Sequence, residues 1–205
     1  TSALIEIILR ERTHPEQGFR ACVGILRLAK TYGCERLEAA CRRALEIGDD
    51  GKVCLVTAEA AAHVAALGAR DGHVQVVPVG AVSKALDGIE LAELGLMARS
   101  SAGVRVFSDD GHCVWDSRLM RRALEYVRAF DGVIAQHAQD PQLAGDSACC
   151  HEGEISGKLG LPGWPAAAEA SVVARDVQIA ELTRSRLHIC HVSCAETIDV
   201  IRWAK

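Results

Sequence analysis

The 205-residue sequence has few aromatic residues, no long apolar run and no strong excess of either charge. Phe, Trp and Tyr make up 4% of the residues, whereas 49% are hydrophobic, so aliphatic side chains must supply most of a buried core. No run approaches the ~18 apolar residues of a membrane-spanning helix, and the first residues lack the basic-then-apolar order of a signal peptide. We therefore expect no membrane association, and the composition favours α/β packing.

Charge and cysteine spacing argue against two further classes of protein. The net charge is −4, and neither the first 48 residues nor the remainder has the dense basic field of a strong nucleic-acid-binding protein. The nine cysteines form no C-x-x-C pair. This distribution is typical of reduced thiols, so we expect a cytoplasmic protein. The lack of an initiator Met indicates that the chain starts inside an open reading frame.

Turn signals divide the sequence into two parts. Residues 1–48 are expected to be a small helical segment with one helix from about 15 to 32 and a second from about 35 to 47. The sequence G-D-D-G at 48–51 is the strongest turn signal in the chain. We therefore predict a first domain at 1–48, a junction at 49–55 and a second domain at 56–205.

After the junction, the hydrophobic pattern alternates between strands and helices. The expected strands cover residues 73–82, 104–108, 133–137 and 187–191, and the expected helices cover 57–68, 90–100, 117–130, 165–183 and 195–203. This alternation predicts a parallel sheet with right-handed crossovers. Four strand–helix units correspond to about half of a (β/α)8 barrel, which has ~250 residues. An open doubly wound sheet is also compatible, although the sequence lacks the G-x-G-x-x-G dinucleotide motif.

Three consecutive predicted strands end in residues that can bind a metal ion. The first ends in the pair Asp109-Asp110, the next in His137 and the last in His191. Because the carboxyl ends of parallel barrel strands lie at one rim, an Asp and two His are expected to meet there. Carboxylate and imidazole groups suit zinc. The alternative interpretation is structural, since each residue alone is common at a strand end or turn, and the spacing leaves both interpretations open.

Two further histidines lie close to these segments. His112 follows the Asp-Asp-Gly turn, and His151 opens the Gly-rich sequence H-E-G-E-I-S-G. We expect the Gly-rich sequence to form a lid over the barrel mouth rather than a ligand segment. The sequence assigns no role to His112.

Five blocks of the sequence resemble bacterial dihydroorotases of the amidohydrolase superfamily. They are V-V-P-V-G-A-V-S-K at 76–84, A-G-V-R-V-F-S-D-D-G at 102–111, L-M-R-R-A-L-E-Y at 119–126, H-E-G-E-I-S-G-K-L-G-L-P-G-W-P at 151–165 and R-L-H-I-C-H-V-S at 186–193. They occur in the family's order and spacing, so the resemblance extends over about residues 56–205. It implies a (β/α)8 barrel with one or two zinc ions that interconverts N-carbamoyl-L-aspartate and L-dihydroorotate in pyrimidine biosynthesis.

The resemblance also implies roles for individual residues. The family's metal-bridging carboxylate falls on Asp110, and two family histidines fall on His137 and His191. Related hydantoinases and allantoinases usually have a carbamylated Lys at the bridging position, so Asp110 favours a dihydroorotase. The family's H-x-H pair has no counterpart here, and Lys52 replaces the Asn of its M-P-N-T-x-P segment. The general acid/base Asp is expected beyond Lys205, so we expect an incomplete, inactive piece with no complete catalytic set and no assigned substrate-binding residue.

The sequence at 14–45 resembles the C-terminal region of insertion-sequence transposases that are encoded beside a helper ATPase. Two unrelated families would then meet at the junction, which predicts a fusion by genomic insertion, rearrangement or misassembly. The alternative function is therefore a fusion remnant that binds DNA or a protein, with phosphate contacts from Arg20, Arg27, Arg42 and Arg43. A solvated helical face is the competing interpretation of these arginines. The sequence predicts no oligomeric state.

Overall fold

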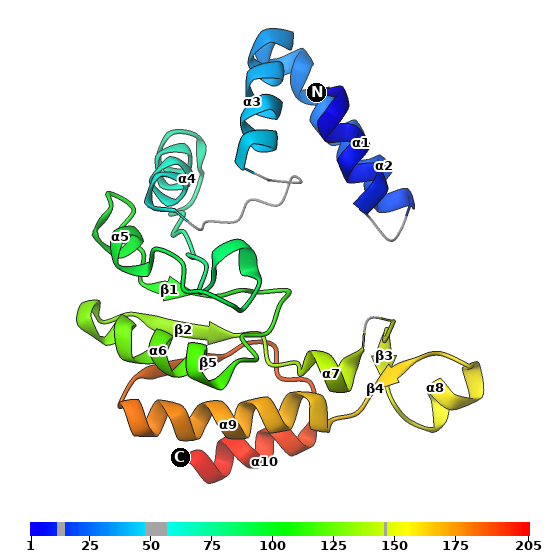
Figure 1. The fold of residues 1–205 in the computed structure, drawn as a ribbon, viewed down its shortest axis with the longest axis vertical. Coiled ribbons are helices and arrows are strands. Elements are labelled where there is room, and N and C mark those ends of the chain that lie inside the picture. Colours follow the sequence, from blue (N-terminus) through cyan, green and yellow to red (C-terminus); the bar gives the residue numbers. More distant parts are fainter. Residues whose placement is uncertain (12–14, 48–56, 146) are drawn as a thin grey trace. The chain divides into compact units, whose positions relative to one another are not determined.

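The structure is a computed structural model that describes residues 1–11, 15–47, 57–145 and 147–205 (Figure 1). The chain divides into two compact units, Thr1–Val53 and Cys54–Lys205, and each is considered by itself. The predicted junction at 49–55 lies outside the described residues. None of the helices in the described ranges is long and apolar enough to cross a membrane.

The described part of the first unit consists of three helices: α1 (Ser2–Glu11), α2 (Pro15–Tyr32) and α3 (Cys34–Ile47). The predicted helices at 15–32 and 35–47 are confirmed. Gly33 separates them with a φ of 85°, a left-handed conformation that favours Gly at the end of a helix. Among the described residues of this unit, the core cluster consists of Leu4, Ile8, Cys22, Leu37 and Cys41.

The second unit is mixed α/β and contains small parallel sheets. Its main sheet has the order β1–β2–β5, and all three strands are parallel. These strands are β1 (Val106–Phe107), β2 (Val133–Gln136) and β5 (Arg186–Ile189). A second parallel pair joins β3 (Cys150–His151) to β4 (Gly163–Trp164). The predicted strands at 104–108, 133–137 and 187–191 are therefore confirmed, with shorter bounds.

Helices follow or connect these strands. They are α4 (Ala58–Asp71), α5 (Leu94–Arg99), α6 (Ser117–Val127), α7 (Pro141–Ala144), α8 (Glu154–Leu159), α9 (Ala167–Thr183) and α10 (Ala195–Ala204), with 3-10 helices η1 at Lys84–Leu86 and η2 at Arg128–Phe130. The predicted helices at 117–130, 165–183 and 195–203 are confirmed, and those at 57–68 and 90–100 are present with shifted bounds. Figure 1 shows α9 and α10 lying side by side below the sheet.

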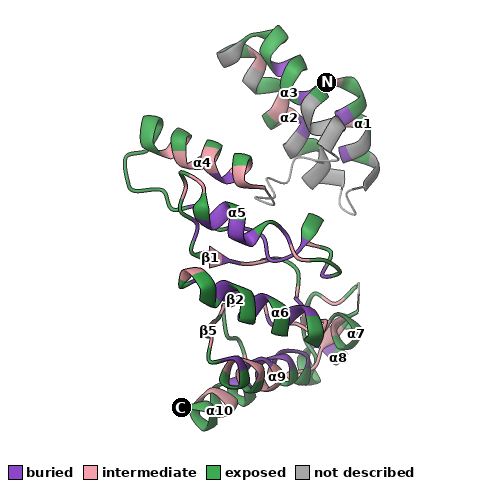
Figure 2. Ribbon diagram, turned by 60° about the vertical axis from the view of Figure 1, so that its left-hand side comes forward, coloured by how far each residue is buried: buried purple, intermediate pink, exposed green. Residues whose placement is uncertain are grey.

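The core of the second unit forms between α5, α6 and the sheet, where buried residues are concentrated (Figure 2). Phe107 and Ile134 contribute from β1 and β2. The Asp116 carboxylate caps α6 by accepting from the Leu119 N–H at 2.6 Å, which satisfies a helix-terminal donor. The helix then presents one apolar face to the sheet, made up of Leu119, Met120, Ala123, Leu124 and Val127.

The predicted strand at 73–82 is wrong. Gly80 alone pairs with β1, through hydrogen bonds of 3.0 Å from its N–H and 2.8 Å to its carbonyl. Pro78 has no N–H to donate to a ladder, which is one physical reason why the pairing does not extend. Val74, Val76, Val77 and Val79 face solvent, whereas Ala81 and Val82 at the end of the segment are buried in the core.

β3 and β4 have no counterpart among the predicted strands. Each is two residues long, and a strand of that length carries no readable alternation of apolar and polar positions. They flank α8, which begins within the Gly-rich sequence at 151–157 that was predicted as a lid. His151 lies in β3 and is exposed.

Candidate metal centre

Three neighbouring strand ends bring Asp110, His137 and His191 together. Asp110 follows β1, His137 directly follows β2 and His191 follows β5, and these strands are adjacent in the sheet. Because the strands are parallel, their carboxyl ends lie at the same edge. The structure therefore places the three predicted ligands at one point.

The atoms that could bind a metal are closely spaced. His137 Nδ1 lies 3.0 Å from His191 Nε2, and Asp110 Oδ1 lies 3.1 Å from His191 Nε2 and 3.4 Å from His137 Nδ1. A tetrahedral zinc ion with bonds of about 2.0–2.1 Å holds its ligand atoms about 3.3 Å apart. This spacing fits such an ion. Within the described ranges, it is the only cluster of three or more His, Cys, Asp or Glu residues with suitably placed atoms.

The electrostatics of the cluster favour a cation. The hydrogen bond from His191 lowers the pKa of Asp110 below its ordinary value, although partial burial opposes the effect. Asp110 is therefore ionised at neutral pH. The side chains of Asp110, His191 and His137 are 67%, 54% and 21% exposed, respectively. The site is thus open to water and to a small molecule.

Gln139 orients the imidazole of His137. Its Oε1 lies 3.2 Å from His137 Nε2, and because an amide oxygen only accepts, this contact assigns the proton to Nε2. The Nδ1 lone pair then faces Asp110 and His191. The proton on His191 Nε2 then lies between His191, Asp110 and His137 Nδ1. A bound cation would take the place of this proton.

Asp109 has a structural role instead. It is 2% exposed, and its carboxylate accepts from the N–H of Val82 at 2.8 Å, from the N–H of Ser83 at 3.0 Å and from the Ser83 hydroxyl. Burial raises the pKa of Asp109, and these hydrogen bonds oppose the rise. The carboxylate ties residues 82–83 to the end of β1.

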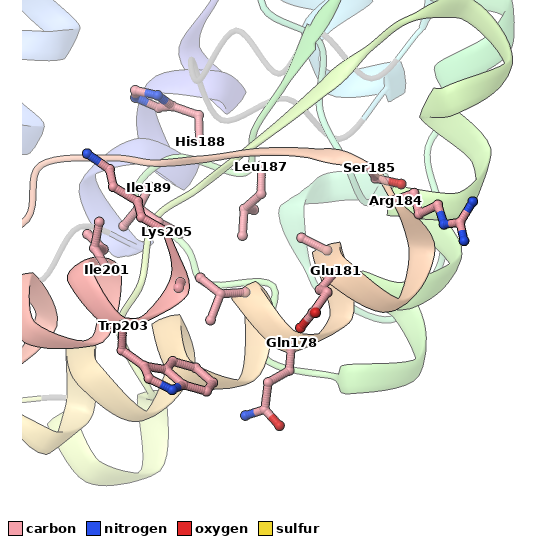
Figure 3. Close-up of a pocket in the computed structure, with 13 residues that line it drawn as sticks. Gln178, Glu181, Arg184, Ser185, Leu187, His188, Ile189, Ile201, Trp203 and Lys205 are labelled. Atoms are coloured by element: carbon pink, nitrogen blue, oxygen red, sulfur yellow. The ribbon is translucent and has the colours of Figure 1, made fainter.

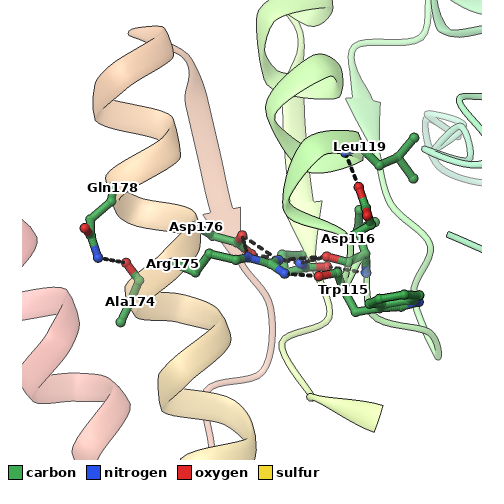
Figure 4. Close-up of polar contacts among 9 residues, drawn as sticks. Trp115, Asp116, Leu119, Ala174, Arg175, Asp176 and Gln178 are labelled. Carbon is green, nitrogen blue, oxygen red and sulfur yellow. Dashed lines mark hydrogen bonds and ion pairs between the residues drawn. The ribbon is translucent and has the colours of Figure 1, made fainter. Parts of the chain in front are cut away.

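A buried network fixes the segment between β1 and α6 (Figure 4). Gln136, at the end of β2, exchanges two hydrogen bonds of 3.1 Å with the backbone of Val114 and donates to Asp176 Oδ2 at 2.8 Å. Arg175 lies 2.6 Å from Asp176 Oδ1 and donates to the carbonyls of Val114 at 2.7 Å and of Trp115. The network therefore holds β2, α9 and this segment together next to the candidate centre.

One cavity lies away from the candidate centre. It has a volume of about 830 Å³ and lies between β5, the C-terminal half of α9 and the end of α10 (Figure 3). None of the three candidate ligands lines it. A smaller cavity of about 160 Å³ is bordered by His137 and Gln139, and also by His112 and Cys113. The smaller cavity is the one next to the cluster, and it places His112 near the site without a ligand contact.

The reactivity of the Cys113 thiol, in the wall of the smaller cavity, tests whether this residue is buried as the structure shows. Burial raises the pKa of the Cys113 thiol from 9.0 to about 11, so the thiol keeps its proton at pH 8. The reactive thiolate is then about a hundredfold scarcer than in the unfolded chain. We expect iodoacetamide to label Cys113 about a hundredfold more slowly in the folded protein than in urea, measured by peptide mass spectrometry. The exposed Cys34 is the control; equal rates for Cys113 in both states would contradict the structure.

Several polar residues around the centre have no counterpart among the predicted site residues: Gln136, Gln139, Glu169 and Asp176. Two of them could have been recognised from the sequence pattern. Glu169 and Asp176 share the buried face of α9 with Val172 and Val173, so both carboxylates occupy positions where apolar side chains are expected. The two glutamines carry no comparable signal.

The fold and the site together define an α/β protein whose neighbouring parallel strands present a carboxylate and two imidazoles at one edge. A family model described as Dihydro-orotase-like matches residues 50–197, and the chain belongs to this family. The fit of the cluster to a divalent cation agrees with this membership. Residues 1–49 lie outside the match, so the transposase resemblance stays a prediction.

Individual relatives match the same part of the chain. It is 61% identical over 149 residues to the dihydroorotase of Leifsonia xyli subsp. xyli, covering 73% of this chain and 34% of the relative. The identity to the dihydroorotase of Streptomyces coelicolor is 58% over 139 residues, covering 68% and 32%. For the dihydroorotase of Mycobacterium tuberculosis it is 51% over 143 residues, covering 70% and 33%. The chain thus spans about a third of the length of these curated relatives.

Proposed function

We propose that residues 56–205 are part of a dihydroorotase-type hydrolase of cyclic amides in which Asp110, His137 and His191 hold zinc. The observation that carries this proposal is the spacing of 3.0–3.4 Å between three ligand atoms on adjacent strand ends. The family match over the same residues supports it. When bound, zinc supplies Lewis-acid activation of water and of an amide carbonyl. The resemblance implies one or two such ions in the complete site.

The proposed architecture is part of a (β/α)8 barrel. Support comes from the parallel order β1–β2–β5, from α6 and α9, which precede β2 and β5 in the chain and pack against them, and from the Gly80 bridge that adds a fourth segment beside β1. A barrel places its active site at the carboxyl ends of the strands, and the cluster lies at those ends.

The residues of this chain would perform three tasks in such a site. Asp110, ionised at neutral pH, supplies negative charge to the cation. His137 presents Nδ1 because Gln139 holds the proton on Nε2. The exposure of Asp110 and His191 leaves space for water and for a small substrate, which we propose is N-carbamoyl-L-aspartate or L-dihydroorotate.

We expect the 205-residue chain alone to bind zinc weakly and to show little or no turnover. The sequence has no H-x-H pair, and no general acid/base is assigned in it. Loss of general acid–base catalysis alone lowers rates by about 10²–10⁴-fold. The test is a zinc titration together with an assay of L-dihydroorotate hydrolysis on the purified chain and on its His137→Asn variant. Tight stoichiometric zinc with normal turnover would refute the expected inactivity, and equal zinc affinity in the variant would refute the ligand assignment.

A further inference from the structure

The loop after β5 carries His191 in an unfavourable backbone conformation. The φ of His191 is 30°, in the left-handed region that residues with a Cβ rarely adopt. Such a conformation persists when surrounding contacts enforce it, and it is common at functional sites. The side chain is also more than half exposed, so packing of the ring alone does not fix it.

Glu169 makes the contacts that enforce the path of this loop. It lies in the first turn of α9 and is 8% exposed. Both of its carboxylate oxygens accept from the Ser193 N–H, at 3.1 and 3.0 Å, and one also accepts from the Ser193 hydroxyl. The N–H and the thiol of Cys194 each lie 3.4 Å from Oε1. A single carboxylate therefore gathers the donors of two successive residues, starting two positions after His191.

These contacts keep Glu169 ionised. Burial raises the pKa of its carboxyl, but hydrogen bonds from Ser193 and Thr197 outweigh burial, so that the pKa is lowered overall. The negative charge lies at the N-terminus of α10, where it is favourable for the helix dipole. Charge-assisted hydrogen bonds are about twice as strong as neutral ones, so the loop is held firmly.

The residues that lead into α10 are held by a carboxylate from another helix. Cys194 occupies the N-cap position and makes no capping hydrogen bond with its side chain. A local Ser or Asp would have capped α10 equally well, but it would not have tied the loop to α9. α9 also carries Asp176 of the network next to β2, so one rigid helix anchors the surroundings of both His137 and His191.

We propose that Glu169 is a positioning residue that holds His191 in place for metal binding. This inference rests on the proposed function, because it assigns a role to Glu169 in the same zinc site. Glu169 lies on α9, whereas every ligand follows a strand, and Glu169 acts through its hydrogen bonds with Ser193 and Cys194. Without it, the loop relaxes from the left-handed conformation at His191, and the imidazole moves away from His137 and Asp110.

The test uses the variants Glu169→Ala and Glu169→Gln in two measurements. Zinc affinity, measured by competition with a fluorescent chelator, is expected to fall about 10–100-fold in Glu169→Ala, as for other residues that orient metal ligands, and less in Glu169→Gln, which keeps one acceptor oxygen. In the metal-free protein, a nuclear Overhauser cross-peak between the rings of His137 and His191, whose centroids are 4.6 Å apart, is expected to be lost in Glu169→Ala and kept in Glu169→Gln.

A control variant distinguishes the loss of His191 positioning from a general loss of stability. Val173→Ala truncates a fully buried side chain on the same helix, so it destabilises the fold while leaving the hydrogen bonds of Glu169 with Ser193 and Cys194 in place. It is expected to keep both the zinc affinity and the cross-peak. Unchanged zinc affinity with an unchanged cross-peak in Glu169→Ala would overturn the proposal, as would equal losses in Val173→Ala. If the wild-type chain binds no zinc, the proposed function fails, and the cross-peak comparison still decides the role of Glu169.

Discussion

Replacing Asp176 with Ala is expected to lower the free energy of unfolding by about 3–5 kcal/mol, the range for breaking a buried ion pair on one side. Asp176 is fully buried, and its two oxygens bind Arg175 and Gln136. Without the carboxylate, the Arg175 guanidinium loses its counter-ion in a partly buried position. The Gln136 amide loses one of its two acceptors. Urea unfolding followed by circular dichroism measures this change.

Two matched variants isolate the cause of this loss. Asp176→Asn keeps the shape and one acceptor but removes the charge, and it is expected to cost about 1–3 kcal/mol. Asp199→Ala removes a carboxylate from the exposed pair with Arg202, and it is expected to change stability by less than about 1 kcal/mol. A loss below about 1 kcal/mol in Asp176→Ala would show that the network contributes no more than a surface pair.

Zinc affinity is expected to fall at least about a hundredfold when His191 is replaced with Ala, because one of three protein ligands is removed. The remaining atoms, Asp110 Oδ1 and His137 Nδ1, are 3.4 Å apart and can still bind the ion, but with two bonds instead of three. The fold is expected to change little, since the His191 side chain is 54% exposed.

His188→Ala is the matched control for this variant. His188 lies on β5, the strand that His191 follows, is exposed and belongs to no cluster of potential ligands among the described residues. Figure 3 shows its ring on the opposite side of β5 from Leu187. Isothermal titration with zinc is expected to give the wild-type affinity for His188→Ala and a strongly reduced one for His191→Ala. Similar affinities for the two variants would mean that His191 is not a ligand.

The elements that could be predicted from the sequence carry strong local patterns. The apolar residues of α6 recur at helical spacing and form its buried face, and β2 and β5 follow from short aliphatic runs. The segment 73–82 has an equally apolar pattern, yet it pairs only at Gly80. Pairing depends on partners far away in the sequence and on the missing donor of Pro78, and local periodicity reports neither.

The three candidate ligands could be predicted from the sequence, but the residues that support them could not. Asp110, His137 and His191 follow directly from strand ends, because a parallel sheet places such ends together. Their support comes from contacts between distant segments. Glu169 meets Ser193 over 24 residues, and Gln136 meets Asp176 over 40. No spacing rule connects residues so far apart, so only the three-dimensional structure identifies these contacts.

The central claim is that Asp110, His137 and His191 bind one metal ion together. Anomalous diffraction from crystals of the chain soaked in zinc, recorded on both sides of the zinc absorption edge, tests it most directly. We predict one strong peak about 2.0–2.2 Å from Asp110 Oδ1, His137 Nδ1 and His191 Nε2. A peak at other residues, or none at this position under millimolar zinc, would contradict the account.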